Sequence, residues 1–292
     1  MDDEFLVRFW GVRGSIACGG ADYAVYGGNT SCLEVRCGGR LLIFDGGTGI
    51  RPLGDRLAAE APLDVKIFLT HTHFDHICGL PFFQPLFDPA NRFEIWSGHL
   101  TWPLSTRDAV HSLMSAPVLP IEPDIFRANV AFRDFKGGET LNLARGLTVR
   151  TTPLNHPNGA TGYRIEHGGR ALCYLTDLEH TGEAPDPALV DFVRGADAMI
   201  YDASYTDAEY ESRRGFGHST WRAGLKLAVA GGVGLYVPFH HDPAHNDAAM
   251  AEIEAEGVAE AAALGMPCVA AREGLTIRPG LRLAQDVEQA LV

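Results

Sequence analysis

The hexapeptide HTHFDH at positions 71–76 constrains this chain more than any other feature of its sequence. It gathers four candidate metal ligands into six residues, directly after the apolar run Val65–Leu69. Imidazole and carboxylate ligands at this density suit zinc, manganese or iron. A helix cannot aim residues 71, 73 and 76 at one point, whereas the turn after a strand can. We therefore expect a metal site at the end of a buried strand, in preference to a solvated histidine-rich loop.

Composition and charge restrict the class of protein. The chain has 292 residues, 46% of them hydrophobic and 21% charged, so it can bury a large core without disulfides. Its net charge of −13 and pI near 5.3 disfavour a general nucleic-acid binder, although they allow a local basic patch. The six cysteines form no CxxC pair, which predicts reduced thiols. An acidic start and the absence of an 18-residue apolar run predict a soluble, cytoplasmic protein without a membrane partner.

No segment of the sequence marks a boundary between domains. We expect one domain over residues 1–292, with an insertion or lid around 80–135. The expected helices are 50–61, 106–114, 220–230 (with Ser219 as candidate N-cap) and 247–264. The expected strands are 5–10, 32–37, 41–45, 65–69, 147–152, 162–166, 171–175, 198–201, 235–238 and 276–278. This order predicts two β-sheets with helices packed outside them.

The hexapeptide resembles the HxHxDH motif of the metallo-β-lactamase superfamily. Four other residues match further motifs of that superfamily, in the right order: Asp45, His156, Asp177 and His240. His241 is a rival for the last of these positions. The resemblance covers about residues 5–245. It implies an α+β fold, the αββα sandwich of two mixed β-sheets flanked by helices.

By this resemblance, the chain would bind two divalent metal ions, with zinc favoured over manganese or iron. The ligands of one ion would be His71, His73 and His156. Those of the other would be Asp75, His76 and His240, with Asp177 bridging the two ions. Asp45 would orient a ligand histidine. Two such ions can hold a bridging hydroxide, which is a nucleophile at neutral pH. Asp75 would be a catalytic residue as well as a metal ligand.

Further segments resemble the ribonuclease Z-like phosphodiesterase branch of the superfamily. Gly217–Thr220 is similar to its GHST segment, whose histidine contacts phosphate or donates a proton to the leaving oxygen. Ile200–Ala203 resembles its HEA segment, with Asp202 in place of the glutamate that orients this histidine. Gly27–Ser31 and Gly79–Pro81 also resemble that branch. The resemblance therefore implies that His218 and Asp202 form a catalytic pair.

Two residues near the N-terminus are candidate substrate contacts. Asn29 lies in Gly27–Ser31, and Arg13 lies in Trp10–Ser15, which resembles superfamily members described broadly as metal-dependent hydrolases. An arginine can bind a phosphate through two parallel hydrogen bonds. The alternatives are a turn role for Asn29 and a structural ion pair for Arg13. The stretch 100–135 combines hydrophobic and acidic residues, which favours a lid over a small or partly apolar substrate.

Together these features predict a dinuclear-metal phosphodiesterase that acts on a small or cyclic-nucleotide-type phosphodiester. The metals would neutralise charge and supply the nucleophile, and His218 with Asp202 would supply the proton for the departing oxygen. The alternatives are a tRNA 3′-processing endonuclease, a thioester or lactone hydrolase, and a non-catalytic metal-binding module. With three lysines and no glycine-rich basic insertion, the chain is poorly suited to nucleic-acid partners. A homodimer is a common state for such enzymes.

Overall fold

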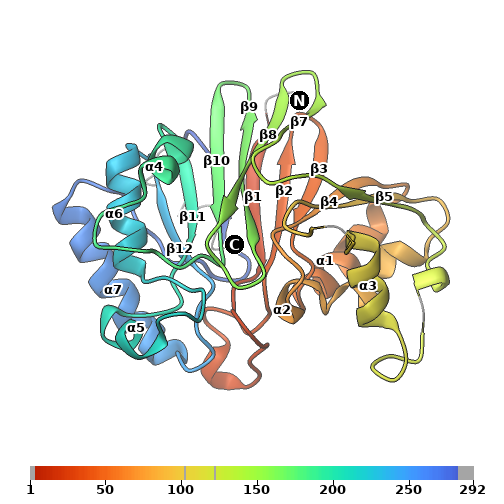
Figure 1. Ribbon diagram of the computed structural model, residues 1–292, viewed down its shortest axis with the longest axis horizontal. Helices are drawn as coiled ribbons and strands as arrows, with labels where there is room; N and C mark the ends of the chain where they lie inside the picture. Colours follow the sequence, from red (N-terminus) through yellow and green to blue (C-terminus); the bar gives the residue numbers. More distant parts are fainter. Residues whose placement is uncertain (1–3, 102, 122, 282–292) are drawn as a thin grey trace.

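The computed structural model describes residues 4–101, 103–121 and 123–281 of the chain. Two β-sheets face each other in the middle of the described molecule, and helices cover the outer face of each (Figure 1). Each sheet combines parallel and antiparallel neighbours. This arrangement confirms the prediction of two mixed sheets flanked by helices.

The first sheet is formed by the first half of the chain together with the last described strand. In spatial order its strands are β13 (Thr276–Ile277), β1 (Phe5–Gly11), β2 (Cys32–Cys37), β3 (Arg40–Phe44), β4 (Asp64–Leu69), β5 (Arg92–Ser97) and β6 (Asn129–Asp134). The second sheet is formed by the second half of the chain. Its strands, again in spatial order, are β12 (Tyr236–Phe239), β11 (Ala198–Asp202), β10 (Arg170–Leu175), β9 (Ala160–His167), β8 (Leu147–Leu154) and β7 (Thr140–Ala144).

The helices divide between the two outer faces (Figure 1). The first sheet is covered by α1 (Ile50–Leu57), α2 (Phe74–Ile77) and α3 (Thr106–Met114). The second is covered by α4 (Pro187–Val193), α5 (Asp207–Arg213), α6 (Trp221–Gly231) and α7 (Asp247–Ala263). Short 3₁₀ turns are η1 (Ala21–Tyr23), η2 (Ala58–Glu60), η3 (Leu80–Phe82), η4 (Gln84–Phe87) and η5 (Pro123–Ile125). None of the described helices has the length and apolar character that a bilayer crossing requires.

The core between the two sheets comes from alternate residues of their strands. β1 buries Phe5, Val7 and Phe9 on one face, while its intervening residues are half-buried. These side chains meet Tyr163 and Tyr174 of the second sheet in one cluster. Complete burial of each such side chain stabilises the fold by about 1.5–3 kcal/mol. The pairing of the two sheets is therefore fixed by an apolar interior, and this fixes the relative positions of their edges.

Parallel strands bring the functional residues to one edge of each sheet. β3 and β4 run parallel in the first sheet, as do β10, β11 and β12 in the second. The carboxyl ends of parallel strands meet at the same edge, where ligand sites commonly form. Asp45, Asp177 and His240 lie just after strands and have positive φ angles of 60°, 59° and 63°. Such conformations are strained for residues with side chains and cluster at functional sites.

Some elements were not predicted from the sequence. Strands β5, β6 and β7 and helices α4 and α5 were missed, whereas the helix expected at 106–114 is α3. The N-cap of α6 is Thr220, whose side chain accepts a hydrogen bond from the Ala223 amide, and not Ser219. Because β5 and β6 belong to the first sheet, part of the stretch 80–135 is framework. The lid itself stays a prediction.

Candidate metal centre

The hexapeptide follows β4 and bends twice. β4 ends at Leu69, and His71 and His73 lie on the turn that follows it. Asp75 and His76 lie on the four-residue helix α2, which begins directly after His73. The sequence predicted a turn after a strand, and the structure adds this single helical turn. The change of direction lets the two pairs of side chains face different parts of one site.

The second sheet supplies its candidate ligands one at a time. His156 follows β8, Asp177 follows β10, and His240 follows β12. His218 lies just before α6, and Asp202 is the last residue of β11. These residues are far apart in the sequence and meet because their strands end at the same edge. The structure thus brings all of these predicted residues to the hexapeptide.

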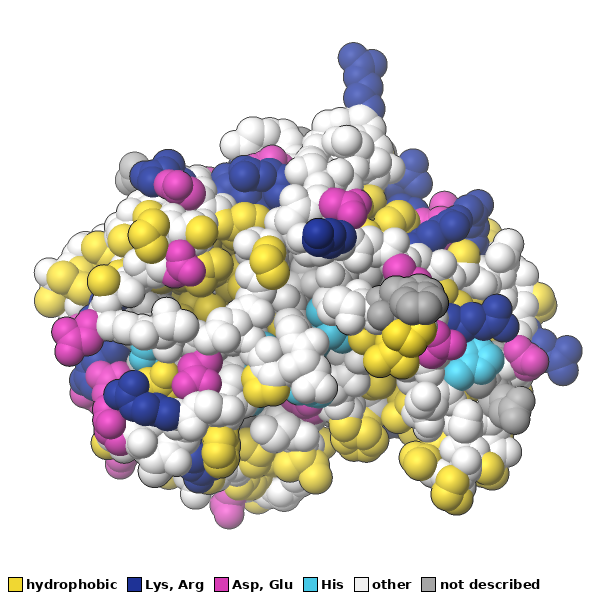
Figure 2. Space-filling model, viewed as in Figure 1, with side chains coloured by type: hydrophobic (Ala, Val, Ile, Leu, Met, Phe, Trp, Pro, Cys, Tyr) yellow, Lys and Arg dark blue, Asp and Glu magenta, His cyan; other side chains and the backbone are white. Residues whose placement is uncertain are grey.

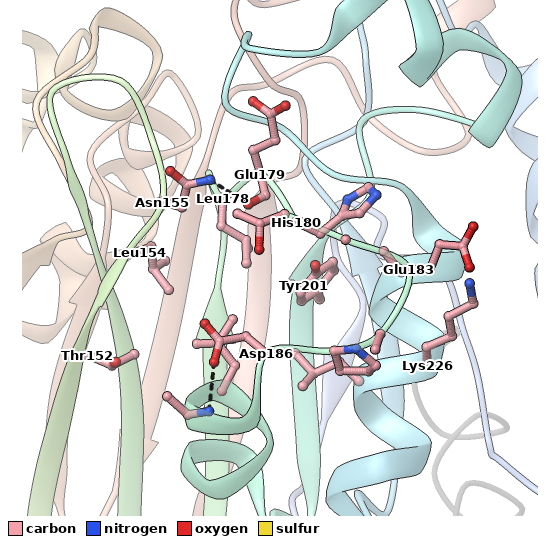
Figure 3. Close-up of a pocket in the computed structure, with 18 of the residues that line it drawn as sticks. Thr152, Leu154, Asn155, Leu178, Glu179, His180, Glu183, Asp186, Tyr201 and Lys226 are labelled. Carbon is pink, nitrogen blue, oxygen red and sulfur yellow. Dashed lines mark hydrogen bonds between the residues drawn. The ribbon is translucent and has the colours of Figure 1, made fainter.

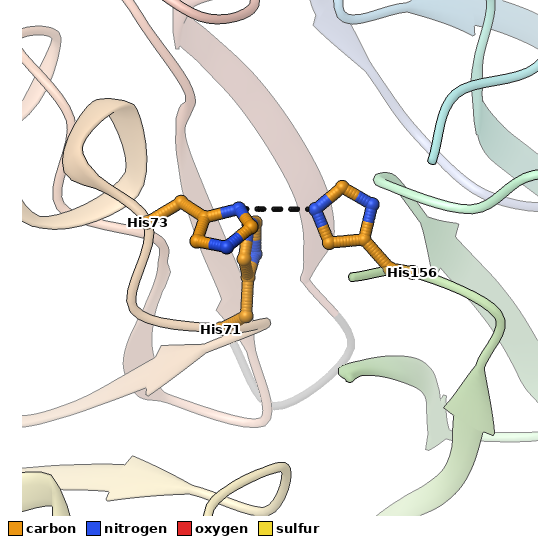
Figure 4. Close-up of side chains that lie close together, drawn as sticks. All are labelled: His71, His73 and His156. Atoms are coloured by element: carbon orange, nitrogen blue, oxygen red, sulfur yellow. Dashed lines mark hydrogen bonds between the residues drawn. The ribbon is translucent and has the colours of Figure 1, made fainter. Parts of the chain in front are cut away.

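Three histidines form the first group of potential metal ligands (Figure 4). His71 and His73 point from the loop after β4, and His156 points toward them from the opposite sheet. The Nδ1 atom of His73 lies 3.1 Å from the Nε2 atom of His156. One ring nitrogen from each of the three residues lies within 4.8 Å of the others. An ion bound among them would meet the all-imidazole donor set that suits zinc.

The second group contains two carboxylates, Asp75 and Asp177, with His76 and His240. The Nε2 atom of His76 lies 3.1 Å from an Asp177 oxygen and 3.3 Å from an Asp75 oxygen. The Nε2 atom of His240 lies 3.3 Å from each of the same two oxygens. The other oxygen of Asp177 lies 3.7 Å from both His71 and His156 of the first group. Asp177 therefore stands between the two groups, as a bridging ligand would.

The first group suits a metal ion in its protonation state as well as its geometry. The Nε2 atom of His71 is buried and has no hydrogen-bond partner among the described residues. A buried polar atom left in this way costs free energy unless a ligand satisfies it. Burial holds the pKa of His71 well below its usual value and also lowers the pKa values of His73 and His156. Neutral imidazole is the form that binds a metal.

The second group concentrates negative charge in a buried place. Burial alone would raise the pKa of Asp177, but His240, His76 and His71 hold it well below its usual value. Burial would lower the pKa of His76, yet the carboxylates of Asp177, Asp75 and Asp45 raise it well above its usual value. Buried carboxylates demand a cation. A divalent ion meets this demand better than a proton on His76, since it brings two positive charges to the two carboxylates.

The ligand histidines of the first sheet are held by a buried network around Asp45. Its carboxylate lies 3.0 Å from the Nδ1 atom of His76. It also accepts hydrogen bonds from the Thr70 amide (2.8 Å) and from the Tyr174 hydroxyl (2.8 Å). The Thr70 hydroxyl lies 3.1 Å from the Nδ1 atom of His71. These bonds fix both rings with their Nε2 atoms toward the site, as outer partners of metal ligands do.

His218 and Asp202 form a close pair beside both groups. The Nδ1 atom of His218 lies 2.9 Å from an Asp202 oxygen and 3.8 Å from an Asp177 oxygen. Burial lowers the pKa of His218, but the charge and hydrogen bond of Asp202 outweigh it and raise the pKa to about 9. The same Asp202 oxygen accepts from the Asp177 amide (3.0 Å), and its other oxygen accepts from the Ser204 hydroxyl (2.8 Å). Asp202 therefore connects the pair to the ligand set.

Two glycines allow the loops to come this close to the ligands. A side chain on Gly217 would place its Cβ 2.5 Å from the Nδ1 atom of His156, and the φ angle there is 88°. A side chain on Gly14 would place its Cβ 2.4 Å from the ring of His240. Both distances are shorter than any normal contact, so larger residues would displace the ligand rings. The glycine of the GHST segment is thus needed for packing as well as for its backbone angle.

A cavity of about 260 Å³ lies on the second-sheet side of the centre (Figure 3). Its lining includes Asn155, which precedes His156, and Tyr201, which precedes Asp202. Glu179 accepts hydrogen bonds from the amides of Gly215 (2.8 Å) and Gly217 (3.0 Å). The Asn155 side chain donates to the Glu179 carbonyl (2.9 Å; Figure 3). These bonds anchor the loop that carries His218.

Besides Asp45, Asp202 and His218, three predicted site residues lie outside the two groups: His241, Arg13 and Asn29. His241 is fully buried and its Nε2 atom bonds the Ala271 carbonyl at 2.8 Å, so His240 and not His241 joins the cluster. Arg13 is also buried, and its guanidinium donates to the carbonyls of Gly27 (2.7 Å) and His245 (2.6 Å). The expected phosphate contact of Arg13 does not fit this placement, because these bonds turn the guanidinium into the interior.

Asn29 is half-buried, with a hydrogen-bond partner in the protein and a place in the lining of a cavity. Its side chain donates to Glu273 (3.0 Å), and the residue lines a second cavity that also touches Asp75. Its role as a substrate contact stays a prediction.

Residues that sequence reasoning missed are Thr70, Tyr174, Ser204 and Ser15. Ser204 lies 3.1 Å from the Nδ1 atom of His240, and the Ser15 amide donates to Asp75 (2.7 Å). No sequence signal marked them, since their contacts with Asp45, His240 and Asp75 join segments that lie far apart in the sequence.

Comparison with known proteins agrees with this geometry. Residues 40–241 match the family model described as the beta-lactamase superfamily domain. Ribonuclease Z of Bradyrhizobium sp. strain ORS 278 is 27% identical over 255 residues, which cover 71% of this chain and 82% of that protein. Ribonuclease Z of Kineococcus radiotolerans is 26% identical over 272 residues, covering 79% and 83%.

Solved structures share the fold at lower identity. The metallo-beta-lactamase fold protein YhfI from Bacillus subtilis superposes with a TM-score of 0.68 at 17% identity, covering 94% of this chain and 99% of that one. A diphosphatase from the PhnP family gives 0.66 at 18% identity, covering 94% and 98%. The short form of human tRNase Z gives 0.67 at 18%, covering 94% and 100%. With more than half of its length matched by the family model, this chain belongs to the metallo-β-lactamase superfamily of metal-dependent hydrolases.

Proposed function

We propose that the protein is a dinuclear-metal phosphodiesterase that cleaves small or cyclic-nucleotide-type phosphodiesters. The observation that carries this proposal is the placement of His218, whose Nδ1 atom is 2.9 Å from Asp202 and 3.8 Å from Asp177. A hydrolase that expels a poor alkoxide leaving group needs a proton donor beside its metals. Thioester hydrolysis does not require one, because a thiolate leaves readily.

The two groups of ligands fit a pair of divalent ions. His71, His73 and His156 would hold one ion, and Asp75, His76 and His240 the other, with Asp177 shared between them. When bound, such ions neutralise the charge of a phosphodiester and lower the pKa of coordinated water to near 7. Zinc is favoured by the histidine-rich first group. The carboxylates of the second group also suit manganese or iron.

The protein's own residues then supply the proton. Asp202 accepts the hydrogen bond of His218 Nδ1, which leaves the Nε2 atom to donate a proton to the departing oxygen. In the metal-free protein, the charge and hydrogen bond of Asp202 raise the pKa of His218 to about 9, which favours the protonated ring. His218 lies 3.8 Å from Asp177, so the proton donor is beside the ligand that the two ions would share. The chain thus combines charge neutralisation and leaving-group protonation at one site.

The test is hydrolysis of bis-p-nitrophenyl phosphate by metal-loaded and metal-stripped protein, with a p-nitrophenyl ester and a thioester assayed in parallel. We expect cleavage of the diester that requires metal and exceeds cleavage of both other substrates. Diester cleavage that is absent from protein with bound metal would overturn the proposal. Faster thioester cleavage would instead support the alternative hydrolase activity.

A second candidate, tRNA 3′ processing, is favoured by the relatives named ribonuclease Z. Against it stand the net charge of −13 and the scarcity of lysines. A tRNA processor neutralises several phosphates and loses affinity steeply as salt rises. Binding of a tRNA precursor measured between about 50 and 200 mM salt separates the two candidates. Tight, steeply salt-dependent binding with cleavage at the 3′ end would favour tRNA.

A further inference from the structure

A cavity of about 450 Å³ lies on the first-sheet side of the metal centre. It is formed by Ile16 and Ala17 after β1, by the start of α1, and by residues 74–82. Binding sites for small ligands typically enclose about 300–1,000 Å³ and are lined mainly by apolar groups with a few polar ones. The size and lining of this cavity fall within that description.

The cavity and the metal centre share a wall. Asp75 lines the cavity, and its carboxylate lies 3.3 Å from the Nε2 atoms of both His76 and His240. The Ser15 amide, next to the cavity residue Ile16, donates to the same carboxylate at 2.7 Å. A molecule in the cavity therefore lies directly beside the candidate ligands. A reactive group carried by that molecule would then lie at the metal centre.

Exposed aromatic rings form part of the cavity lining. Phe74 is 60% exposed and Phe82 is 54% exposed, although both are large apolar residues. Ile16, also in the lining, is 60% exposed. Hydrophobic side chains gather over α2 and the loop between β1 and β2, at the lower edge of the face shown in Figure 2. Clustered exposure of this kind marks a surface that binds another molecule.

The polar groups of the cavity are mostly engaged with one another. The Thr30 amide donates to the Thr48 hydroxyl (2.9 Å), and the Thr48 amide donates to the Thr30 hydroxyl (2.8 Å). The Asn29 side chain donates to Glu273 (3.0 Å). Arg51 stands apart, because its side chain is 67% exposed and its ion pair with Asp55 is long, at 3.8 Å. The lining thus offers a largely apolar surface with a guanidinium at its rim.

We propose that this cavity binds the nucleobase of a nucleotide-type phosphodiester. The base would stack on the exposed rings of Phe74 and Phe82, while Arg51 donates hydrogen bonds to its acceptor edge. Asp75 in the shared wall would leave the phosphodiester at the metal centre. This assignment rests on the proposed phosphodiesterase function, to which it adds the position and class of the bound group.

The cavity of Figure 3 is a weaker candidate for the same ligand. Glu179, Glu183 and Asp186 line it together with Lys226. Three carboxylates against one ammonium repel an anionic substrate. Its other polar groups, His180 and Tyr201, both contact Ser219 and support the loop of His218. The aromatic cavity beside Asp75 therefore fits a nucleotide better.

The test compares two p-nitrophenyl diesters that differ in the second group. Thymidine 5′-(p-nitrophenyl phosphate) carries a base, and methyl p-nitrophenyl phosphate does not. The measured quantity is the ratio of their kcat/KM values for the wild type, for Phe82→Ala, and for Phe82→Leu, which keeps apolar bulk without the ring. Loss of one stacking partner should lower the ratio by about tenfold in Phe82→Ala, and by less in Phe82→Leu. Leu264→Ala, an exposed apolar position at the C-cap of α7, is the matched control and should keep the wild-type ratio.

Binding of thymidine 5′-monophosphate, measured by calorimetry on the same proteins with equal metal content, separates this proposal from the proposed function. An affinity that falls about tenfold in Phe82→Ala supports the cavity assignment, whether or not the wild type cleaves either diester. Absence of cleavage of both diesters by the wild type would overturn the phosphodiesterase function alone. An unchanged ratio and an unchanged affinity in Phe82→Ala would overturn the cavity assignment, whatever the turnover. Absence of nucleotide binding by the wild type would overturn it as well.

Discussion

The two sheets build the metal centre in different ways. The first contributes His71, His73, Asp75 and His76 from one short segment after β4. The second contributes five residues from five separate places in the sequence, namely His156, Asp177, Asp202, His218 and His240. The first set is local and is fixed by one turn and one short helix. The second set depends on the order in which six strands pair.

This difference shows where positional accuracy comes from. In the first sheet, Asp45 and Thr70 fix the rings of His76 and His71 through a compact buried network. In the second, Ser204 supports His240 and the Gly217 carbonyl supports His156, while Asp202 bonds His218, the Asp177 amide and Ser204. Loss of Ser204 or of the Gly217 contact should therefore act mainly through one ligand. Loss of Asp45 should affect two ligands at once.

The largest effect should follow removal of the residue that joins the two halves. Asp177→Ala deletes the carboxylate that lies 3.1 Å from His76 and 3.7 Å from both His71 and His156. We expect loss of bound metal and a fall in diester cleavage of more than ~100-fold. Loss of a residue that only hydrogen-bonds a metal ligand typically costs up to ~100-fold. Metal analysis and kcat/KM check this. Glu183→Ala, an exposed acidic change on the loop after Asp177, is the control. Full metal content in Asp177→Ala would show that the halves are not joined there.

Removal of the proton donor should spare the metals and slow the reaction. His218→Ala should lower kcat roughly 10²- to 10⁴-fold, the usual contribution of a positioned acid, while metal content stays near the wild-type value. The reason is that Asp202 holds the Nδ1 atom of His218 and each of the two proposed ions has its own ligands. Loss of metal in His218→Ala would instead point to the further group of potential ligands formed by Asp177, Asp202, His218 and His240. His111→Ala on α3 serves as a histidine control remote from the centre. Equal kcat values for His218→Ala and the wild type would exclude His218 from the mechanism.

The supports of the two sheets can be compared directly. Asp45→Asn weakens a charged contact to His76, while Ser204→Ala removes a neutral contact to His240. Charge-assisted hydrogen bonds are about twice as strong as neutral ones. We expect metal affinity to fall about 10- to 100-fold in Asp45→Asn and by less in Ser204→Ala. Competition with a chelator measures both. A larger loss in Ser204→Ala would reverse the proposed difference between the sheets.

The smallest of these changes tests packing on the second sheet. Gly217→Ala adds a Cβ 2.5 Å from His156 at a φ angle of 88°. The backbone angle alone should lower the free energy of unfolding by about 1–2 kcal/mol. Urea unfolding measures this loss. Gly182→Ala, where an added Cβ meets nothing within 4 Å, should leave the stability close to that of the wild type. Equal stabilities would show that the loop before His218 adapts freely.

The comparison of the sheets also explains what the sequence could reveal. The hexapeptide was recognisable because its ligands are contiguous, and β4 was recognisable because Val65–Leu69 is a continuous apolar run. The separate residues His156, Asp177 and His240 could be placed only through the resemblance and its order of motifs. The structure places His240 in the group of potential ligands, whereas the Nε2 atom of His241 bonds the Ala271 carbonyl.

Other features lay beyond sequence reasoning for physical reasons. Strand β6 is an outer strand with half-buried residues, so it lacks a strong apolar signal. Arg13 looked like a phosphate ligand because its guanidinium suits one, yet its partners are carbonyls distant in the sequence. The cavity beside Asp75 joins three segments and has no local motif. Such features depend on packing between elements that only the folded chain brings together.

The most direct test of the central claim is a count of metal ions per chain in the wild type, His73→Ala and His240→Ala, with diester cleavage measured on the same samples. His73 belongs to the first sheet and to the three-histidine group, while His240 belongs to the second sheet and to the carboxylate group. The account predicts two ions in the wild type, one in each variant, and strongly reduced cleavage in both. A single ion in the wild type, or two ions retained in either variant, would contradict a centre built jointly by the two sheets.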